Sequence, residues 1–197
     1  GLWLGFACKE ADSGVFPHLR VLFVVSSHDK LGDTGKSTGF WLPELTHPYF
    51  AMNSPGKDRV IDIDIASPKG GKAPVDPRSV DLKDPDNKRF MESADTKRAI
   101  ENTIPLSKVK IADYKGVFFV GGHGPMWDLA DNADVRKITR TMYENKHPVA
   151  AVCHGPAALV NVQLKGGKYL VDGKKVTSFT NAEEEGLGYT KVVPFLL

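Results

Sequence analysis

The chain has 197 residues and a formal net charge of +2. That length fits one domain with a sizeable core, and the weak, scattered charge gives no indication of nucleic-acid binding or of a membrane-surface protein. No apolar run is long enough for a transmembrane helix. The two cysteines, Cys8 and Cys153, lie far apart without the spacing of a zinc site or a disulfide framework, so we expect no metal and a reduced, cytoplasmic setting.

The N-terminal residues 1–19 are expected to be an extension ahead of a single domain, 20–197. The apolar start GLWLGFAC ends at Cys8 and is followed by polar residues. This order fits the tail of a lipoprotein signal, in which Cys8 would be the lipidated residue. However, Gly5 stands where such signals usually carry leucine, and no basic start precedes it. A plain extension is therefore the preferred interpretation.

The first half of the domain alternates between strand and helix patterns. Residues 20–27 form a continuous apolar run, as a strand buried on both faces requires, and 59–66 is a β-branched strand pattern. Helical spacing is present over 42–52 and 87–102. The intervening stretch 68–86 is rich in Pro, Gly and Lys and predicts a long connection.

The second half continues the same alternation. Expected strands are 116–120, 148–152 and 174–179, expected helices are 131–145 and one that begins near Pro156, and 181–185 is expected to be an acidic turn. Strands that alternate with helices predict an α/β fold, namely a flavodoxin-like parallel sheet sandwiched between helices. Because sites in such folds lie at the carboxyl ends of the strands, the chemistry should gather at one edge of the sheet.

Cys153 and His154 occupy a predicted corner between a strand and a helix. A cysteine on such a corner has the geometry of a nucleophile elbow. The N–H groups of the following helix favour a negative charge, so we expect a lowered thiol pKa and a reactive thiolate. The alternative is that Cys153 is a small buried hydrophobic residue, as most free cysteines are.

A cysteine nucleophile needs a proton acceptor and a group that orients it. His154 is adjacent in sequence, although adjacent side chains on a corner need not meet. An orienting acid can come from 183–185, three consecutive glutamates that otherwise form a solvated turn. Glu44 lies in the first turn of an apolar helix, where burial would keep its carboxyl protonated and able to donate or shuttle protons. Its alternative role is to complement the helix dipole.

The glycine loop after the strand at 116–120 is a candidate oxyanion hole. Backbone N–H groups around Gly122, His123 and Gly124 can donate to a developing negative charge. A glycine turn after a strand is common, so the loop is weak support on its own. The glycine spacing also excludes a dinucleotide-binding fingerprint.

Taken together, these motifs resemble the ThiJ/PfpI superfamily, and most closely its glyoxalase III-like and stress-chaperone branch. The resemblance covers residues 20 to 197, and its motifs occur in the expected order. The motifs are TGFWLPE at 38–44, ASPKGG at 66–71, GGHGPMWD at 121–128, VAAVCHGP at 149–156 and FTNAEEE at 179–185. The resemblance implies a class I glutamine-amidotransferase-like fold.

The resemblance also implies roles for individual residues. Cys153 would be the nucleophile, His154 its partner, Glu184 the acid of a Cys-His-Glu triad and Glu44 the carboxyl group at the thiolate. The amides of Gly122 and His154 would be the oxyanion donors. The implied activity converts methylglyoxal or a related α-oxoaldehyde to a hydroxy acid such as lactate through a Cys153 hemithioacetal, without glutathione, metal or another cofactor.

Other functions known among such relatives remain open at this point. They are a holding chaperone of the stress response, a cysteine peptidase or amidase, and a protein deglycase with the same Cys-His-Glu site. Members of the family often dimerise, so a homodimer is expected. They also normally continue past Pro194–Leu197 with a further helix and strands, so we expect the C-terminal part of the family domain to be missing from this chain.

Overall fold

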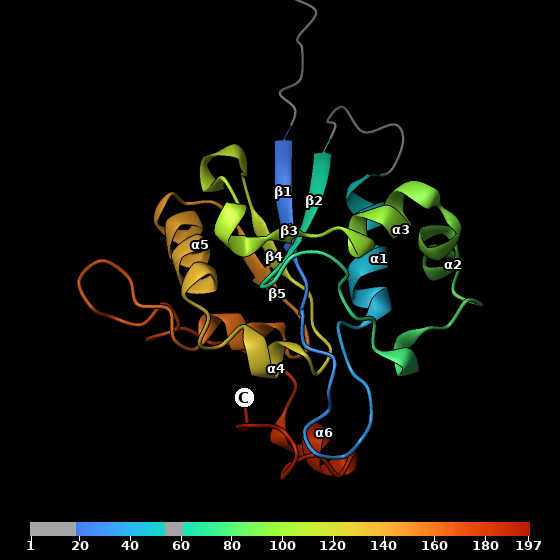
Figure 1. The fold of residues 1–197 in the computed structure, drawn as a ribbon. Helices are drawn as coiled ribbons and strands as arrows, with labels where there is room; N and C mark the ends of the chain where they lie inside the picture. Colours follow the sequence, from blue (N-terminus) through green and yellow to red (C-terminus); the bar gives the residue numbers. More distant parts are fainter. Residues whose placement is uncertain (1–18, 54–60) are drawn as a thin grey trace, which may run out of the picture.

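The computed structural model describes residues 19–53 and 61–197, and these contain one parallel sheet (Figure 1). The expectations for residues 1–18, including a lipidated Cys8, lie outside the described residues. The strand order is β3-β2-β1-β4-β5. The strands are β1 (Leu19–Val24), β2 (Ile61–Ser67), β3 (Ile104–Pro105), β4 (Val117–Phe119) and β5 (Val149–Ala151). Every neighbouring pair is parallel, which confirms the predicted flavodoxin-like α/β fold.

Helices cover both faces of the sheet, because the strands are apolar on both sides (Figure 1). The helices are α1 (Leu42–Met52), α2 (Pro85–Glu92), α3 (Ala94–Glu101), α4 (Pro125–Asp128), α5 (Ala133–Glu144) and α6 (Asn181–Gly186). On one face, Phe23 of β1 packs in a cluster with residues of α1, α2 and α3. On the other face, Leu22 and Val24 pack with residues of α5.

The helix starts follow local sequence signals. Asp84 and Asn132 cap α2 and α5, each by accepting two backbone N–H groups with its side chain. Thr180 and Glu183 form a reciprocal capping box at α6. The boundaries of α1 agree with the predicted range, because Pro43 fits the first turn of that helix.

Three local predictions were wrong. The expected strand at 174–179 is not a strand, and Val176 is 63% exposed, so its short apolar pattern has no sheet neighbour to bury it. The helix expected near Pro156 is present, as a short 3-10 helix over Gly155–Leu159. The expected acidic turn is the helix α6, and the expected long helix is divided into α2 and α3 at Ser93.

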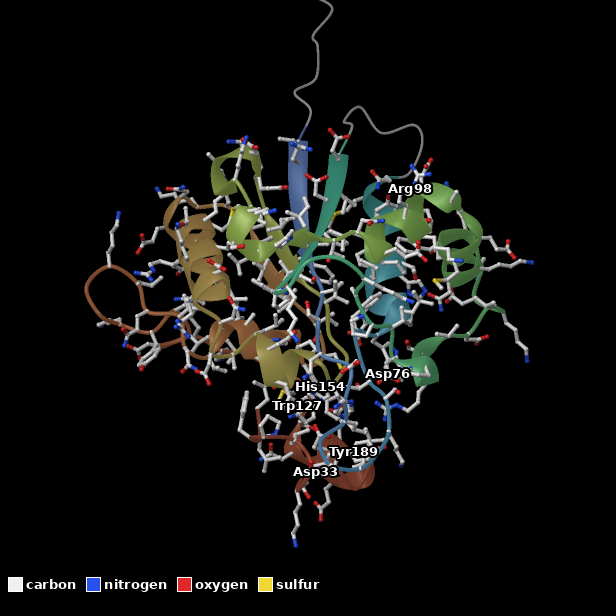
Figure 2. The ribbon with its side chains drawn as sticks, in the orientation of Figure 1. Asp33, Asp76, Arg98, Trp127, His154 and Tyr189 are labelled. Carbon is white, nitrogen blue, oxygen red and sulfur yellow. The ribbon has the colours of Figure 1, made fainter. Side chains whose placement is uncertain are left out.

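The loops after β1, β4 and β5 converge with α6 beyond the carboxyl ends of the strands. In Figure 2, Asp76, His154 and Tyr189 lie at this end of the molecule, whereas Arg98 lies at the other end. Within 19–53 and 61–197, no helix is both long and apolar enough to cross a membrane.

Candidate active site

Cys153 lies two residues after β5 in a strained backbone conformation. Its φ of 58° is in the left-handed region, which costs a residue other than glycine about 1–3 kcal/mol. The backbone N–H groups of Gly122 and His154 donate to its sulfur. The corner therefore presents the thiol to two backbone donors, and its strain is typical of a functional site.

The pKa of Cys153 departs from the sequence-based expectation. Burial and, after it, the nearby Glu44 carboxyl raise the thiol pKa to about 12, and the two backbone amides oppose this only partly. The expected helix N-terminus is only a five-residue 3-10 helix, so little dipole acts on the sulfur. A thiolate here therefore depends on a base that takes the proton and on a neutral Glu44.

The environment of Glu44 keeps its carboxyl group close to neutrality. Burial raises the pKa of Glu44 to about 7, against opposing hydrogen bonds from Cys153 and the Gly121 amide. One of its oxygens, Oε2, is buried and has no hydrogen-bond partner among the described residues. At neutral pH this carboxyl group can both accept and donate a proton.

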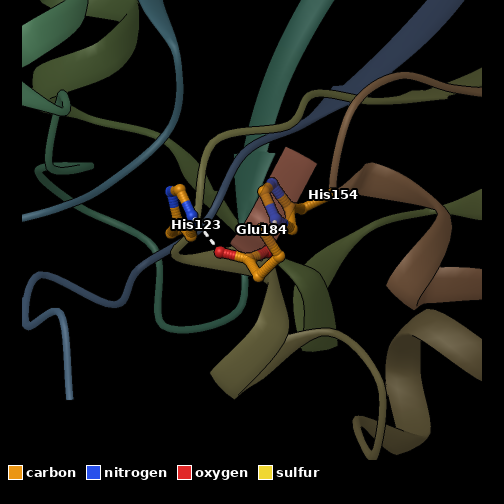
Figure 3. Close-up of side chains that lie close together, drawn as sticks. All are labelled: His123, His154 and Glu184. Atoms are coloured by element: carbon orange, nitrogen blue, oxygen red, sulfur yellow. Dashed lines mark hydrogen bonds and ion pairs between the residues drawn. The ribbon is translucent and has the colours of Figure 1, made fainter. Parts of the chain in front are cut away.

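His154 joins Cys153 to a buried acid. Its Nδ1 lies 3.3 Å from the Cys153 sulfur, and its Nε2 lies 2.8 Å from Oε2 of Glu184. The second oxygen of Glu184, Oε1, lies 2.9 Å from Nε2 of His123 (Figure 3). The three side chains of His123, His154 and Glu184 are at most 5% exposed. The Glu184 carboxylate thus forms one hydrogen bond with each of the two imidazole rings.

Of the three consecutive glutamates, the structure places Glu184 in the site. Glu183 is exposed and caps α6 through Thr180, and Glu185 is also exposed. The helical turn of α6 is what separates them, because it directs consecutive side chains to different faces. Phe179, just before α6, stacks on the His154 ring at a centroid distance of 4.4 Å.

Burial keeps both histidines neutral. It lowers the pKa of His154 to about 4 and also lowers the pKa of His123, although Glu184 acts in the opposite direction on each. A neutral His154 that donates from Nε2 to Glu184 has its Nδ1 lone pair directed at the thiol. His154 is thus in the correct form to accept the proton of Cys153.

The glycine loop after β4 lies against this corner. Gly122 has a φ of 92°, and its amide donates to the Cys153 sulfur. The His123 side chain contacts Glu184 rather than an open space, and Gly124 packs against Ser26. The structure therefore brings together Cys153, His154, Glu184, Glu44 and Gly122, and the side chain of His123 contacts Glu184.

The prediction did not single out two features of this site. Gly121 leaves room for the catalytic pair, because an added Cβ would overlap Oε2 of Glu44 and lie 2.6 Å from Cβ of Cys153. Arg78 contacts Nδ1 of His123 at 3.2 Å and is itself paired with Asp76. The glycine-rich loop was a signal for Gly121, whereas no sequence pattern marks Asp76 or Arg78.

The same groups have the composition of a metal site. Ligand atoms of His123, His154 and Glu184 lie within 4.8 Å of one another. However, the hydrogen bonds to Glu184 already use the Nε2 atom of each histidine. This arrangement fits proton transfer from a thiol better than ligation of an ion.

Comparisons with known proteins find relatives that cover most of the chain. Glyoxalase 3 of Candida albicans is 32% identical over 181 residues, which are 89% of this chain and 75% of that protein. Glutathione-independent glyoxalase HSP31 of Saccharomyces cerevisiae is 29% identical over 182 residues, 90% of this chain and 75% of that protein.

Solved structures show the same fold. The Rapid Encystment Protein 24 kDa of Francisella tularensis matches with a TM-score of 0.85 and 41% identity, covering 91% of this chain and 78% of that one. Glyoxalase III of Candida albicans matches with a TM-score of 0.78 and 31% identity, covering 88% of this chain and 73% of that one. The DJ-1/PfpI family model matches residues 40–192, which include Glu44, Cys153 and Glu184. The family model spans most of the domain and the relatives cover most of the chain, so the chain belongs to the DJ-1/PfpI family.

Proposed function

We propose that this chain is a glutathione-independent glyoxalase that converts methylglyoxal or a related α-oxoaldehyde to a hydroxy acid. The observation that carries the proposal is the contact series Cys153–His154–Glu184, with the Glu44 carboxyl at the same sulfur. Relatives that cover most of the chain carry the names glyoxalase 3 and glutathione-independent glyoxalase. A cytoplasmic location and a homodimer stay predictions.

The reaction begins with proton transfer inside the site. Nδ1 of His154 accepts the thiol proton, and the sulfur attacks the aldehyde carbon of the substrate. The carbonyl oxygen becomes an oxyanion beside the amides of Gly122 and His154, and it takes up a proton to give a hemithioacetal. No external thiol is needed, because Cys153 supplies the thiol that glutathione would otherwise supply for addition to the aldehyde.

The second stage moves a proton between the two former carbonyl carbons. A base removes the hydrogen of the first carbon, and an acid delivers a proton to the second. The hydroxyl proton of the first carbon's oxygen passes to the oxygen of the second, which leaves a thioester of the hydroxy acid. Glu44, with its pKa raised to about 7 by burial, suits both tasks near neutral pH. Water then cleaves the thioester, so that methylglyoxal and one water give lactic acid and free Cys153.

The experiment that tests this function measures lactate formed from methylglyoxal without glutathione, with an assay specific for D-lactate. Wild type should form lactate, and Cys153→Ala should form none above the uncatalysed rate. Cys8→Ala is the matched control, because it removes the other cysteine and should retain the activity. Equal lactate formation by wild type and Cys153→Ala would overturn the mechanism. Failure of the wild type to form lactate would overturn the function.

A further inference from the structure

Arg78 lies at the edge of the site with nearly all of its hydrogen-bond donors in use. Its Nε and Nη2 donate to the two oxygens of Asp76 at 3.0 and 2.6 Å, and its Nη1 donates to the hydroxyl of Tyr189 at 3.3 Å. Nη2 also donates to Nδ1 of His123 at 3.2 Å. A guanidinium has five N–H donors, so only one is left for a substrate.

The position of Arg78 is fixed by a buried carboxylate. Asp76 is fully buried and accepts hydrogen bonds from the Thr38 hydroxyl and from the backbone N–H of Arg78, besides the guanidinium. Burial alone would raise the pKa of Asp76, but these hydrogen bonds and the charge of Arg78 hold it below its usual value. The aromatic rings of Trp41 and Tyr189 lie 5.8 and 5.6 Å from the guanidinium carbon. Arg78 is therefore oriented before any substrate binds.

The chemistry of arginine sets the direction of the hydrogen bonds beyond it. Arginine can only donate, so Nδ1 of His123 must accept and the ring proton must lie on Nε2. That proton is donated to Oε1 of Glu184. Glu184 Oε2 then accepts from His154, and the lone pair of His154 Nδ1 faces Cys153.

We propose that Arg78 is a positioning residue for catalysis, which acts by fixing the Nε2–H tautomer of His123 and thereby the orientation of Glu184 and His154. This inference rests on the proposed function of the Cys153 site. If Arg78 were absent, only the hydrogen bond to Glu184 would favour Nε2–H, and His123 could also carry its proton on Nδ1. Its Nε2 lone pair would then face a carboxylate oxygen, and Glu184 would lose one of its two donors.

A double-mutant cycle tests whether Arg78 acts through His123. Glutamine at position 123 can offer an amide N–H to Glu184 and has no tautomer to fix. Arg78→Met should therefore lower kcat/KM about 10- to 100-fold in the wild-type background, since a misplacement of about 1 Å in a catalytic site can cost about 10²-fold. In the His123→Gln background the same change should cost less than about 3-fold. An equal loss in both backgrounds would overturn the proposal.

A spectroscopic measurement keeps the inference testable apart from the activity. ¹⁵N NMR of the ligand-free protein should show His123 as a single Nε2–H tautomer. Arg78→Lys retains a positive charge opposite Asp76, but one ammonium lacks the planar fork that serves Asp76 and His123 together, so the second tautomer should appear. Arg20→Lys is the matched control, since Arg20 also pairs with an aspartate, Asp64. Persistence of the single tautomer in Arg78→Lys would overturn the proposal, even if the protein proved inactive on methylglyoxal.

Discussion

Two arginine–aspartate pairs lie in different parts of the fold, and their contrast shows what makes one of them part of a site. In the sheet, Arg20 of β1 pairs with Asp64 of β2 at 3.0 Å, and Asp64 accepts the hydroxyl of Tyr114. At the carboxyl end of the sheet, Arg78 pairs with Asp76 at 2.6 Å. Both arginines lie near aromatic rings.

The two pairs differ in burial and in the groups to which their hydrogen bonds lead. Asp64 has a side chain that is 26% exposed, whereas that of Asp76 is fully buried. The hydrogen bonds at Asp64 reach a tyrosine hydroxyl, whereas those from Arg78 continue through His123 to Glu184. An ion pair therefore becomes functionally important where its geometry sets the proton positions of a neighbouring nucleophile.

Among the variants that keep Cys153, Glu184→Gln should have the largest effect on activity. Arg78 holds the lone pair of His123 at Nδ1, so His123 must still donate to the single amide oxygen. The amide N–H₂ would then face His154 and force its proton onto Nδ1, towards the thiol. Lactate formation should fall about 10³- to 10⁴-fold, as in other triads whose acid becomes an amide.

Asp64→Asn is the control for this change, because it makes the same kind of substitution next to the other arginine. Steady-state kinetics should show its kcat/KM within about twofold of wild type, since surface-proximal changes away from a site have small effects. A Glu184→Gln enzyme with nearly normal turnover would show that the tautomer of His154 does not limit the reaction.

Alanine substitutions at Gly116 and Gly121, which lie before and after β4, test how closely each end of the sheet is packed. An added Cβ at Gly121 would overlap Glu44 and lie 2.6 Å from Cβ of Cys153, whereas at Gly116 its nearest neighbour would be 3.6 Å away. Gly121→Ala should cost about 1–3 kcal/mol of stability through overpacking and about 10²-fold in kcat/KM through displaced groups. Gly116→Ala should change both only slightly. Urea denaturation and lactate kinetics measure the two effects, and equal behaviour of the two variants would contradict this role of Gly121.

The helices and strands that have a regular apolar pattern were predictable from the sequence. The apolar pattern located α1 and four of the five strands within a few residues, and the corner at Cys153 was predictable from the order of strand, cysteine and proline. The strand β3 escaped notice because it has only two residues, Ile104 and Pro105. Periodicity needs a longer segment to be recognised.

The supporting contacts of the site were not predictable, since they join segments that are distant in sequence. Arg78 meets His123 across 45 positions and Tyr189 across 111, and it belongs to a connection without periodic pattern. The thiol pKa was misjudged for a related reason. Its direction depends on burial and on the distance to Glu44, neither of which a strand-to-helix corner specifies.

The ionisation of Glu44 should make its own contribution to the pH dependence of the free energy of unfolding. Because burial raises its pKa from 4.5 to about 7, the folded protein holds this proton more tightly than the unfolded chain does. Its contribution to stability is therefore fully present below pH 4.5 and is lost as the pH rises towards 7. At most, this contribution to the free energy of unfolding is about 3 kcal/mol.

Glutamine at position 44 cannot lose this proton, so Glu44→Gln should gain stability relative to wild type between pH 4.5 and about 7. The lowered pKa of His154 makes a contribution of opposite sign, but it is common to both proteins and cancels in their difference. Urea denaturation at pH 5 and pH 8 measures the change. A stability difference that is independent of pH would mean that Glu44 ionises at its ordinary pKa in the folded protein.

The smallest effects are expected when a single hydroxyl that donates to Asp76 or to Asp64 is removed. Thr38→Val removes a 2.9 Å hydrogen bond to the buried Asp76, and Tyr114→Phe removes a 2.8 Å hydrogen bond to the partly exposed Asp64. Each should cost about 1–2 kcal/mol in urea denaturation, with the larger loss for Thr38→Val because no water can replace its hydroxyl. Only Thr38→Val should also reduce kcat/KM, by a few-fold, because Asp76 orients Arg78. If Tyr114→Phe reduced turnover as much as Thr38→Val, the two pairs would be equally coupled to Cys153, and burial would not be what distinguishes them.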